Sequence, residues 1–355
     1  MKGLILASGY GTRLAPLTAS GNKHLLPIAN KPMVLYGLEA LKHAGIEDIG
    51  VVIGPFGEGI ERLLGDGASH SVRITYIKQP NPRGIAEAIG MAEKFIGRSP
   101  FVVYLGDNIL SEGIAPIVAA GSAEGVGCVV GVSKSPDPSR FGVVTLHGDT
   151  VTDIEEKPAR PKSNMVLTGI LLFKPDVFDV IKRLRPSARG ELELVDAIRG
   201  IADKGLKVKA VSFDGWWRDA GSKEDMLDTN RLILETIKNR IDGKVERGAK
   251  VGRPVVIGKG SIIRRGAEVK AFTIIGNGCE IGNDAVVGSF ASIGDGTKIL
   301  GADVSSSIVM RNVVIGGRLL LTNSIVGDMA EMRGSSKGKR KRVELVLGQQ
   351  SRLKL

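Results

Sequence analysis

Cysteine, histidine and the aromatic residues are scarce in this 355-residue sequence, and each scarcity excludes a class of protein. Cys128 and Cys279 are too few for a disulfide framework. Aromatic residues make up 4% of the chain, which argues against a surface of stacked rings for nucleic acid. The N-terminal apolar run, residues 3–7, is too short for the core of a secretion signal. We therefore expect a cytoplasmic protein with reduced thiols and no membrane partner.

The positive charge of the chain is concentrated near its C-terminus. The formal net charge is +11, and residues 333–355 hold eight lysines and arginines against the single acid Glu344. No aromatic residue lies among these cations, so they do not form the usual pattern of a nucleic-acid site. We expect residues 331–355 to form a solvated basic tail, and nucleic acid not to be a partner.

Residues 1–241 have the pattern of an α/β domain. A chain of this length exceeds what one hydrophobic core usually fills, so two domains are expected. Apolar runs of strand length alternate with helix-period segments, which predicts a mostly parallel, doubly wound sheet covered by helices. The expected strands are residues 2–8, 49–54, 73–77 and 101–106. One expected helix begins at Pro32 and ends at Gly45, and three further helices are expected over residues 84–96, 175–184 and 222–237.

A six-residue period begins after Gly243. Nine aliphatic residues stand six apart, and six of the nine are followed by glycine. This is the hexapeptide pattern of a parallel β-helix, whereas a β-sandwich would alternate every two residues. The period decays after residue 300, and we place the repeat domain at residues 242–330. The nine residues are Val251, Ile257, Ile263, Val269, Ile275, Ile281, Val287, Ile293 and Ile299.

A glycine-containing loop, Ser8 to Leu14, follows the first expected strand, and its backbone N–H groups can surround phosphate oxygens. It is not a dinucleotide fingerprint, because Leu14 stands where the third glycine belongs and no ribose-binding acid follows the second strand. The guanidinium of Arg13 can form bidentate hydrogen bonds with a triphosphate, and Lys23 follows as a second cation. A plain strand-to-loop turn fits the same residues.

Longer motifs resemble those of the sugar-1-phosphate nucleotidylyltransferases, and they cover nearly the whole chain. The set is most similar to members that use glucose 1-phosphate and dTTP and carry a C-terminal left-handed β-helix. Ser8 departs from the usual Gly or Ala, and Ala220 from the usual Thr. The motifs are L-I-L-A-S-G-Y-G-T-R-L-A-P-L-T (4–18), N-K-H-L-L-P-I (22–28), Q-P-N-P-R-G-I-A-E-A (79–88), L-G-D-N (105–108), R-F-G-V-V (140–144), E-E-K-P (155–158), S-A-R-G-E-L-E-L (187–194) and G-W-W-R-D-A-G (215–221).

Two motifs allow more than one interpretation from their residues alone. A carboxylate after a buried strand, such as Asp107, can hold Mg²⁺ or cap a loop. Glu156 and Lys157 can bind a substrate or form a solvated turn. The resemblance implies that Arg13, Lys23, Asp107 and Lys157 are catalytic, and that Asp107 and Asp219 hold Mg²⁺. It implies nucleotide binding by Leu6, Ala7, Ser8, Gly9, Gly11, Thr12, Arg13, Gln79, Gly84 and Asp107, and sugar-phosphate binding by Asn108, Gly142, Glu156, Lys157 and Thr168.

The function that we expect from the resemblance is formation of dTDP-glucose and pyrophosphate from dTTP and glucose 1-phosphate. A uridylyltransferase acting on the same sugar is the alternative, because no motif distinguishes the two bases. Hexapeptide-repeat acyltransferases usually need a histidine base, and residues 244–355 contain none. A non-enzymatic scaffold is disfavoured because the cations and carboxylates named above are retained. We expect the β-helix to be structural and the protein to be a homo-oligomer.

Overall fold

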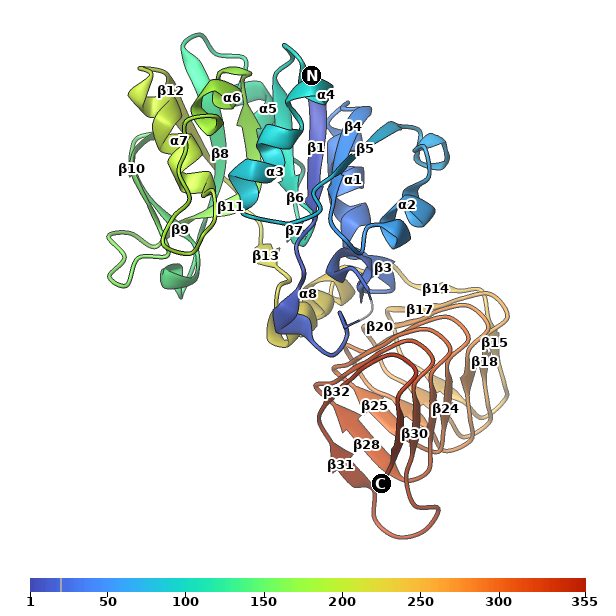
Figure 1. The fold of residues 1–355 in the computed structure, drawn as a ribbon. Helices are drawn as coiled ribbons and strands as arrows, with labels where there is room; N and C mark the ends of the chain where they lie inside the picture. The colour runs from blue at the N-terminus through green and yellow to red at the C-terminus, as the bar shows by residue number, and fades with distance from the viewer. Residues whose placement is uncertain (20) are drawn as a thin grey trace. The chain divides into compact units, whose positions relative to one another are not determined.

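The computed structural model describes residues 1–19 and 21–355. The chain forms two compact units. One joins Met1–Tyr10 to Met33–Asp219, and the other joins Gly11–Pro32 to Ala220–Leu355 (Figure 1). This grouping differs from the linear boundary expected at residue 241, because the segment that follows the first loop belongs with the C-terminal strands.

A nine-stranded sheet organises the first unit, in the order β5-β4-β1-β6-β11-β8-β12-β10-β9. Strands β11 and β10 run against their neighbours, and the other seven share one direction. The expected mostly parallel, Rossmann-like sheet is confirmed. The strands are β1 (Lys2–Ala7), β4 (Asp48–Ile53), β5 (Arg73–Lys78), β6 (Phe101–Leu105), β8 (Val126–Lys134), β9 (Gly142–His147), β10 (Thr150–Glu156), β11 (Met165–Phe173) and β12 (Lys207–Ser212).

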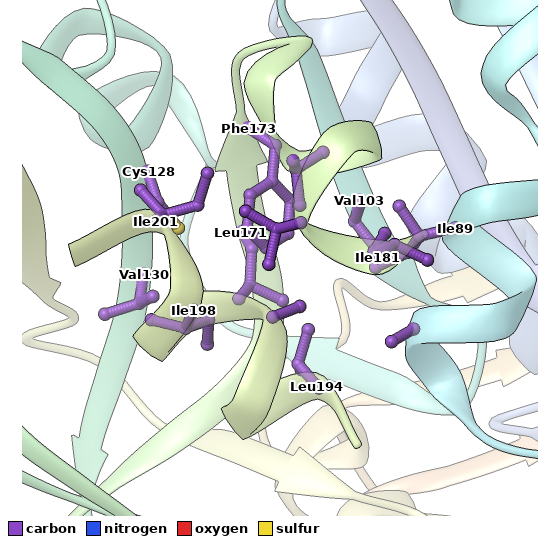
Figure 2. Close-up of a cluster of buried hydrophobic side chains, with 14 of the residues drawn as sticks. Ile89, Val103, Cys128, Val130, Leu171, Phe173, Ile181, Leu194, Ile198 and Ile201 are labelled. Carbon is purple, nitrogen blue, oxygen red and sulfur yellow. The ribbon is translucent and has the colours of Figure 1, made fainter. Parts of the chain in front are cut away.

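Helices cover both faces of this sheet. Leu4 and Leu6 of β1 belong to a core with four of the helices, while Gly3 lies against Leu41 of the first helix on the other face. Figure 2 shows the former core, in which side chains from α3, α6 and α7 meet those of β6, β8 and β11. The helices are α1 (Met33–His43), α2 (Glu58–Leu64), α3 (Ile85–Met91), α4 (Glu93–Ile96), α5 (Ala115–Ala120), α6 (Asp176–Ile181) and α7 (Leu194–Asp203).

The helix expected at Pro32 begins one residue later. Pro32 instead pairs with Pro27 in a short hairpin, formed by β2 (Pro27–Ile28) and β3 (Lys31–Pro32). The helix expected over residues 84–96 is divided at Ala92 into α3 and α4. Within the described part of the chain, no helix is long and apolar enough to cross a bilayer.

Three parallel sheets of short strands build the C-terminal part of the second unit, which has the architecture of the expected left-handed β-helix. The first sheet holds β14 (Arg240–Ile241), β17 (Val255–Ile257), β20 (Thr273–Ile275), β23 (Ser292–Ile293), β26 (Ile308–Val309), β29 (Ile325–Val326) and β32 (Val346–Leu347). The second holds β15 (Lys244–Val245), β18 (Ile262–Ile263), β21 (Glu280–Ile281), β24 (Lys298–Leu300), β27 (Val314–Gly316), β30 (Glu331–Arg333) and β33 (Arg352–Lys354). The third holds β16 (Lys250–Val251), β19 (Glu268–Val269), β22 (Val286–Val287), β25 (Asp303–Ser305), β28 (Leu319–Thr322) and β31 (Lys341–Val343).

The strand register explains why the six-residue period fades. Ile275 pairs with Ile293, eighteen residues or three hexapeptides later, but Ile293 pairs with Val309 only sixteen residues later. Residues 331–355, which we expected to form a basic tail, continue the same sheets through β30 to β33. Apolar side chains still pack in the interior there, so the β-helix continues beyond the residues that keep the six-residue period. Met332 is fully buried, and Leu347 and Leu353 pack against the same core.

One further helix and one further strand pair lie in different units. Helix α8 (Lys223–Leu234) belongs to the second unit, and the Ser222 side chain caps it by accepting a hydrogen bond from the Asp225 N–H. In the first unit, β13 (Trp217–Asp219) pairs antiparallel with β7 (Asn108–Leu110). The β13–β7 pairing joins two motifs that are more than one hundred residues apart in the sequence.

Ile281→Asp should destabilise the β-helix. Ile281 is fully buried between Ile263 and Ile299, and an aspartate there would leave a carboxyl group without polar partners. We expect a loss of roughly 4 kcal/mol in the free energy of unfolding, measured by urea denaturation. The matched control is Lys298→Asp, a change at an exposed residue of β24, which should cost less than about 1 kcal/mol. Equal losses in the two variants would contradict the interior position.

Candidate active site

The candidate residues divide between the two compact units, so each group is described by itself. Most of them belong to the first unit. Gly11, Thr12, Arg13 and Lys23 belong to the second. In the first unit, Leu6 and Ala7 are buried at the end of β1, where the Leu6 carbonyl accepts a hydrogen bond from the Gly106 N–H at 3.0 Å. Since their side chains are buried, only their backbone could serve a ligand.

A hydrogen-bonded chain fixes the amide of Gln79, which is 1% exposed. The Ser8 hydroxyl donates to Gln79 Oε1, and Gln79 Nε2 donates to Glu87 Oε2 at 2.8 Å. Burial alone would raise the pKa of Glu87, but hydrogen bonds from Gln79 and Arg83 outweigh it and lower the pKa below its usual value. An ionised Glu87 therefore holds Gln79 in one orientation. The serine that departs from the family pattern is part of this chain.

Gly84, in the motif of residues 79–88, lies against Leu192 of the motif of residues 187–194. Its φ is 110°, and a Cβ at this position would lie 2.4 Å from the Leu192 carbonyl oxygen. No other residue fits without moving the backbone. The Leu192 N–H donates to the Arg83 carbonyl and the Leu192 carbonyl accepts from Ala86, so the segment containing residues 79–88 is bound to the one containing 187–194.

Asp107 directly precedes β7 and Asp219 ends β13, and these two strands pair with Asp219 opposite Asn108. Asp107 is 7% exposed and Asn108 is 2% exposed. Asn108 Nδ2 donates to Asp107 Oδ1 at 2.9 Å, while its Oδ1 accepts from the Gly169 N–H at 3.1 Å and from Trp217 Nε1 at 2.7 Å. These bonds fix the orientation of the Asp107 carboxylate.

The negative charge of Asp107 also acts on its surroundings. Burial raises the pKa of Tyr104 far above its usual value, and the charge of Asp107 raises it further. Tyr104 therefore stays a neutral donor, and its hydroxyl donates to the Asn108 carbonyl at 3.1 Å. A fixed, ionised carboxylate at the C-terminal edge of a sheet can serve as a metal ligand.

The donor set of Asp107 and Asp219 fits Mg²⁺. This ion prefers oxygen ligands, and it is commonly held by one or two carboxylates together with substrate phosphates and water. Among the described residues, no group of three or more His, Cys, Asp or Glu side chains could hold a metal ion alone. A site here would need oxygens from its substrate, which suits a phosphate-bearing ligand.

Glu156 and Lys157 lie at the end of β10, where Glu156 is opposite Gly142 of β9. Their side chains are 3.5 Å apart, and the Lys157 N–H donates to the Phe141 carbonyl at 3.0 Å. The left-handed backbone at Lys157, with φ 42°, turns the chain away from the strand. The two charged side chains are 27% and 48% exposed, so both can meet a solvent-borne ligand.

Arg189 completes this cluster, and the sequence motif alone did not single it out. Its guanidinium donates to Glu156 Oε1 at 3.1 Å and to Glu193 Oε2 at 2.7 Å. Glu193 is buried and also accepts from the Ser187 hydroxyl at 2.6 Å. The spacing of Arg189 and Glu193, four residues apart within the S-A-R-G-E-L-E-L motif, was the available signal.

Thr168 lies on the buried strand β11. Its side-chain oxygen is buried and has no hydrogen-bond partner among the described residues. A buried hydroxyl without a partner costs free energy, about 1–3 kcal/mol. A sugar hydroxyl could satisfy this oxygen when substrate binds.

In the second unit, the backbone of Gly11 adopts the left-handed conformation with φ 65°, and a Cβ there would lie 2.8 Å from Lys23 Cβ. Thr18 Oγ1 donates to the Gly11 carbonyl at 2.9 Å. Thr12 and Arg13 begin a 3₁₀ turn, Thr12–Leu14, and both are exposed. Lys23 begins another, Lys23–Leu25, which the Asn22 side chain caps. The close approach of Gly11 to Lys23 brings the expected loop and second cation together.

Comparison with known proteins agrees with the motifs. The family model described as nucleotidyl transferase matches residues 2–236. The chain is 43% identical over 258 residues to the low-salt glycan biosynthesis nucleotidyltransferase Agl11 of Haloferax volcanii, covering 69% of this chain and 72% of that protein. It is 40% identical over 266 residues to a glucose-1-phosphate thymidylyltransferase of Streptomyces griseus, covering 74% and 75%.

A solved structure gives the same result. The crystal structure of a candidate glucose-1-phosphate thymidylyltransferase from Bacillus anthracis, in complex with sucrose, matches with a TM-score of 0.63 and 39% identity. The match covers 68% of this chain and 98% of that one. Since the family model spans more than half of the sequence, and the relatives match over most of their length, the chain belongs to the nucleotidyl transferase family.

Proposed function

We propose that this protein is a glucose-1-phosphate thymidylyltransferase, which forms dTDP-glucose and pyrophosphate from dTTP and glucose 1-phosphate. The observation that carries the proposal is the grouping, in one compact unit, of the fixed Gln79 amide, the Asp107–Asp219 pair and the Glu156–Lys157 cluster. The name of the Streptomyces griseus relative supports the choice of substrates.

The reaction joins two polyanions, and the proposed residues offset their repulsion. A phosphate oxygen of the sugar phosphate attacks the α-phosphorus of the nucleotide, the bond from that phosphorus to the β-phosphate oxygen breaks, and pyrophosphate leaves in line. Lys157 binds the sugar phosphate, Glu156 accepts hydrogen bonds from sugar hydroxyls, and Arg13 and Lys23 bind the triphosphate. Mg²⁺, when held by Asp107 and Asp219, supplies positive charge at the α-phosphate.

Base recognition falls to Gln79 and the Gly84 backbone in this proposal. The hydrogen bond from Ser8 and the hydrogen bond to Glu87 fix the orientation of the Gln79 amide. A fixed orientation is needed because a pyrimidine edge presents donors and acceptors in a set order. Consumption of a nucleoside triphosphate and the two buried free thiols, Cys128 and Cys279, fit a cytoplasmic enzyme. We also propose that it acts as a homo-oligomer.

Pyrophosphate release, measured over a matrix of five nucleoside triphosphates and several sugar 1-phosphates, tests the proposed function directly. We expect the highest kcat/KM with dTTP and glucose 1-phosphate, because the fixed amide suits a pyrimidine and the Streptomyces griseus relative is named for this pair of substrates. A preference for UTP would favour the uridylyltransferase alternative. No turnover with any pair would contradict the function itself.

Removal of the metal should abolish turnover. EDTA is expected to stop pyrophosphate release and added Mg²⁺ to restore it, while Asp107→Asn should lower kcat by about 10² without unfolding the protein. The matched control is Asp203→Asn, at the exposed end of α7, which should leave kcat unchanged. Activity that survives both chelation and the Asp107 substitution would rule out the metal assignment.

Alanine substitutions of Lys157 and Arg13 should have different kinetic effects. Lys157→Ala removes the cation expected at the sugar phosphate, so KM for glucose 1-phosphate should rise about tenfold or more while KM for the nucleotide changes little. Arg13→Ala should chiefly raise KM for the nucleotide or lower kcat.

Steady-state kinetics with each substrate varied in turn separates these effects. Lys162→Ala is the control for Lys157, because Lys162 is an exposed lysine whose ammonium pairs with Asp153 at 2.8 Å and with Glu155 at 3.0 Å. The separate roles are incorrect if Lys157→Ala and Arg13→Ala have the same pattern of kinetic defects.

A further inference from the structure

One buried side chain in the second unit forms hydrogen bonds to two other segments of the chain. Asn230 of α8 is 1% exposed. Its Oδ1 accepts hydrogen bonds from the Ala29 N–H and from the Ser292 hydroxyl, both at 2.9 Å, and its Nδ2 donates to the Phe290 carbonyl at 3.2 Å. The amide therefore joins a coil of the β-helix to the turn of the β2–β3 hairpin.

That turn has a backbone conformation that its alanine does not favour. Ile28 pairs with Lys31, so Ala29 and Asn30 are the two turn residues, and their φ values are 49° and 62°. A two-residue turn with both φ values positive is of type I′, which favours asparagine and glycine. Alanine is strained there because its Cβ crowds the backbone.

Contacts from outside the hairpin hold this turn in place. Asn230 satisfies the Ala29 N–H, and Asn30 Nδ2 donates to the Ile293 carbonyl of β23 at 2.6 Å. Strained backbone persists only where its surroundings determine it. The β-helix thus fixes both residues of the turn, one directly and one through Asn230.

The hairpin is adjacent in sequence to a proposed catalytic residue. The 3₁₀ turn Lys23–Leu25 ends two residues before Pro27, the first residue of β2. His24 in this turn is 2% exposed, and its N–H and its Nδ1 both lie within hydrogen-bond distance of Asn22 Oδ1, at 2.9 and 2.6 Å. Only Leu26 separates the 3₁₀ turn Lys23–Leu25 from the β2–β3 hairpin, so few backbone dihedral angles are free between them. A movement of the hairpin would therefore also move Lys23.

We propose that Asn230 is a positioning residue through which the β-helix holds Lys23 in its working place. The role given to Lys23 rests on the proposed function, whereas the contacts of Asn230 are independent of it. In this proposal the β-helix helps to position a residue of the active site, in addition to its structural role.

Asn230→Ala in the full-length enzyme tests this inference. We expect kcat/KM for the nucleotide to fall tenfold or more at temperatures where the variant is folded, because small displacements of catalytic groups are costly. KM for the sugar phosphate should stay within about twofold of wild type, since its proposed ligands belong to the other unit.

The matched control is Ser292→Ala. It removes one hydrogen bond to the same Asn230 oxygen and leaves the bond to Ala29 intact. This variant should lower the thermal midpoint and leave kcat/KM within about twofold. If Asn230→Ala lowers stability but keeps full activity when folded, the residue is only structural and the proposal is wrong.

A second substitution provides a rescue. Glycine adopts positive φ without strain, so Ala29→Gly should hold the turn without help from Asn230. The double variant Ala29→Gly/Asn230→Ala should recover most of the lost kcat/KM. Absence of recovery, in a double variant that is folded, would overturn the proposed route through the turn.

Hydrogen exchange separates this inference from the proposed function. Amides of residues 22–31 should exchange at least about tenfold faster in Asn230→Ala than in Ser292→Ala, whatever reaction the enzyme catalyses. If exchange rises but no substrate pair is turned over by the wild type, the proposed function fails and the anchoring stands. Unchanged exchange in Asn230→Ala would contradict the anchoring itself.

Discussion

Burial of β1 between two parallel neighbours is the constraint on which the candidate site depends. The strand pairs with β4 on one side and β6 on the other, and its residues from Gly3 onward are buried. Parallel strands end at one edge of the sheet, so the residues after β1, β5 and β6 must meet there. Ser8 and Gln79 directly follow β1 and β5, and Asp107 lies two residues beyond the end of β6. A change that shifted the register of β1 would therefore disturb the whole nucleotide motif.

The polar groups at this edge are held by one another, which prepares them for charged substrates. Glu87 orients Gln79, Asn108 orients Asp107, and Arg189 lies between Glu156 and Glu193. The Gln79 amide and the Asp107 and Glu156 carboxylates thus have their orientations set before binding. Preorganised charge of this kind lowers the cost of bringing two polyanions together, because less reorganisation is needed during the reaction.

The sequence predicted those parts of the structure that depend on local pattern. The expected strands agree with β1, β4, β5 and β6 within one or two residues, and the nine aliphatics six apart predicted the β-helix. The position of residues 331–355 was not predicted, because coils of unequal length hide their period. Arg189 was missed because its partner Glu156 is 33 residues away. Distant pairs of this kind leave no periodic signal in a single sequence.

The link between the β-helix and the hairpin could not be read from the sequence for a related reason. Two of the acceptors on the β-helix, at Phe290 and Ile293, are main-chain carbonyls, which every residue type supplies. The side chains in the link, Asn30, Asn230 and Ser292, carry a chemical signature, but Asn30 lies two hundred residues or more from the other two. The acceptors also lie in the coil just before the repeat shortens from eighteen residues to sixteen. A regular repeat can support an irregular turn in this way, since its backbone offers carbonyls at fixed spacing while its interior aliphatics keep the coils stacked.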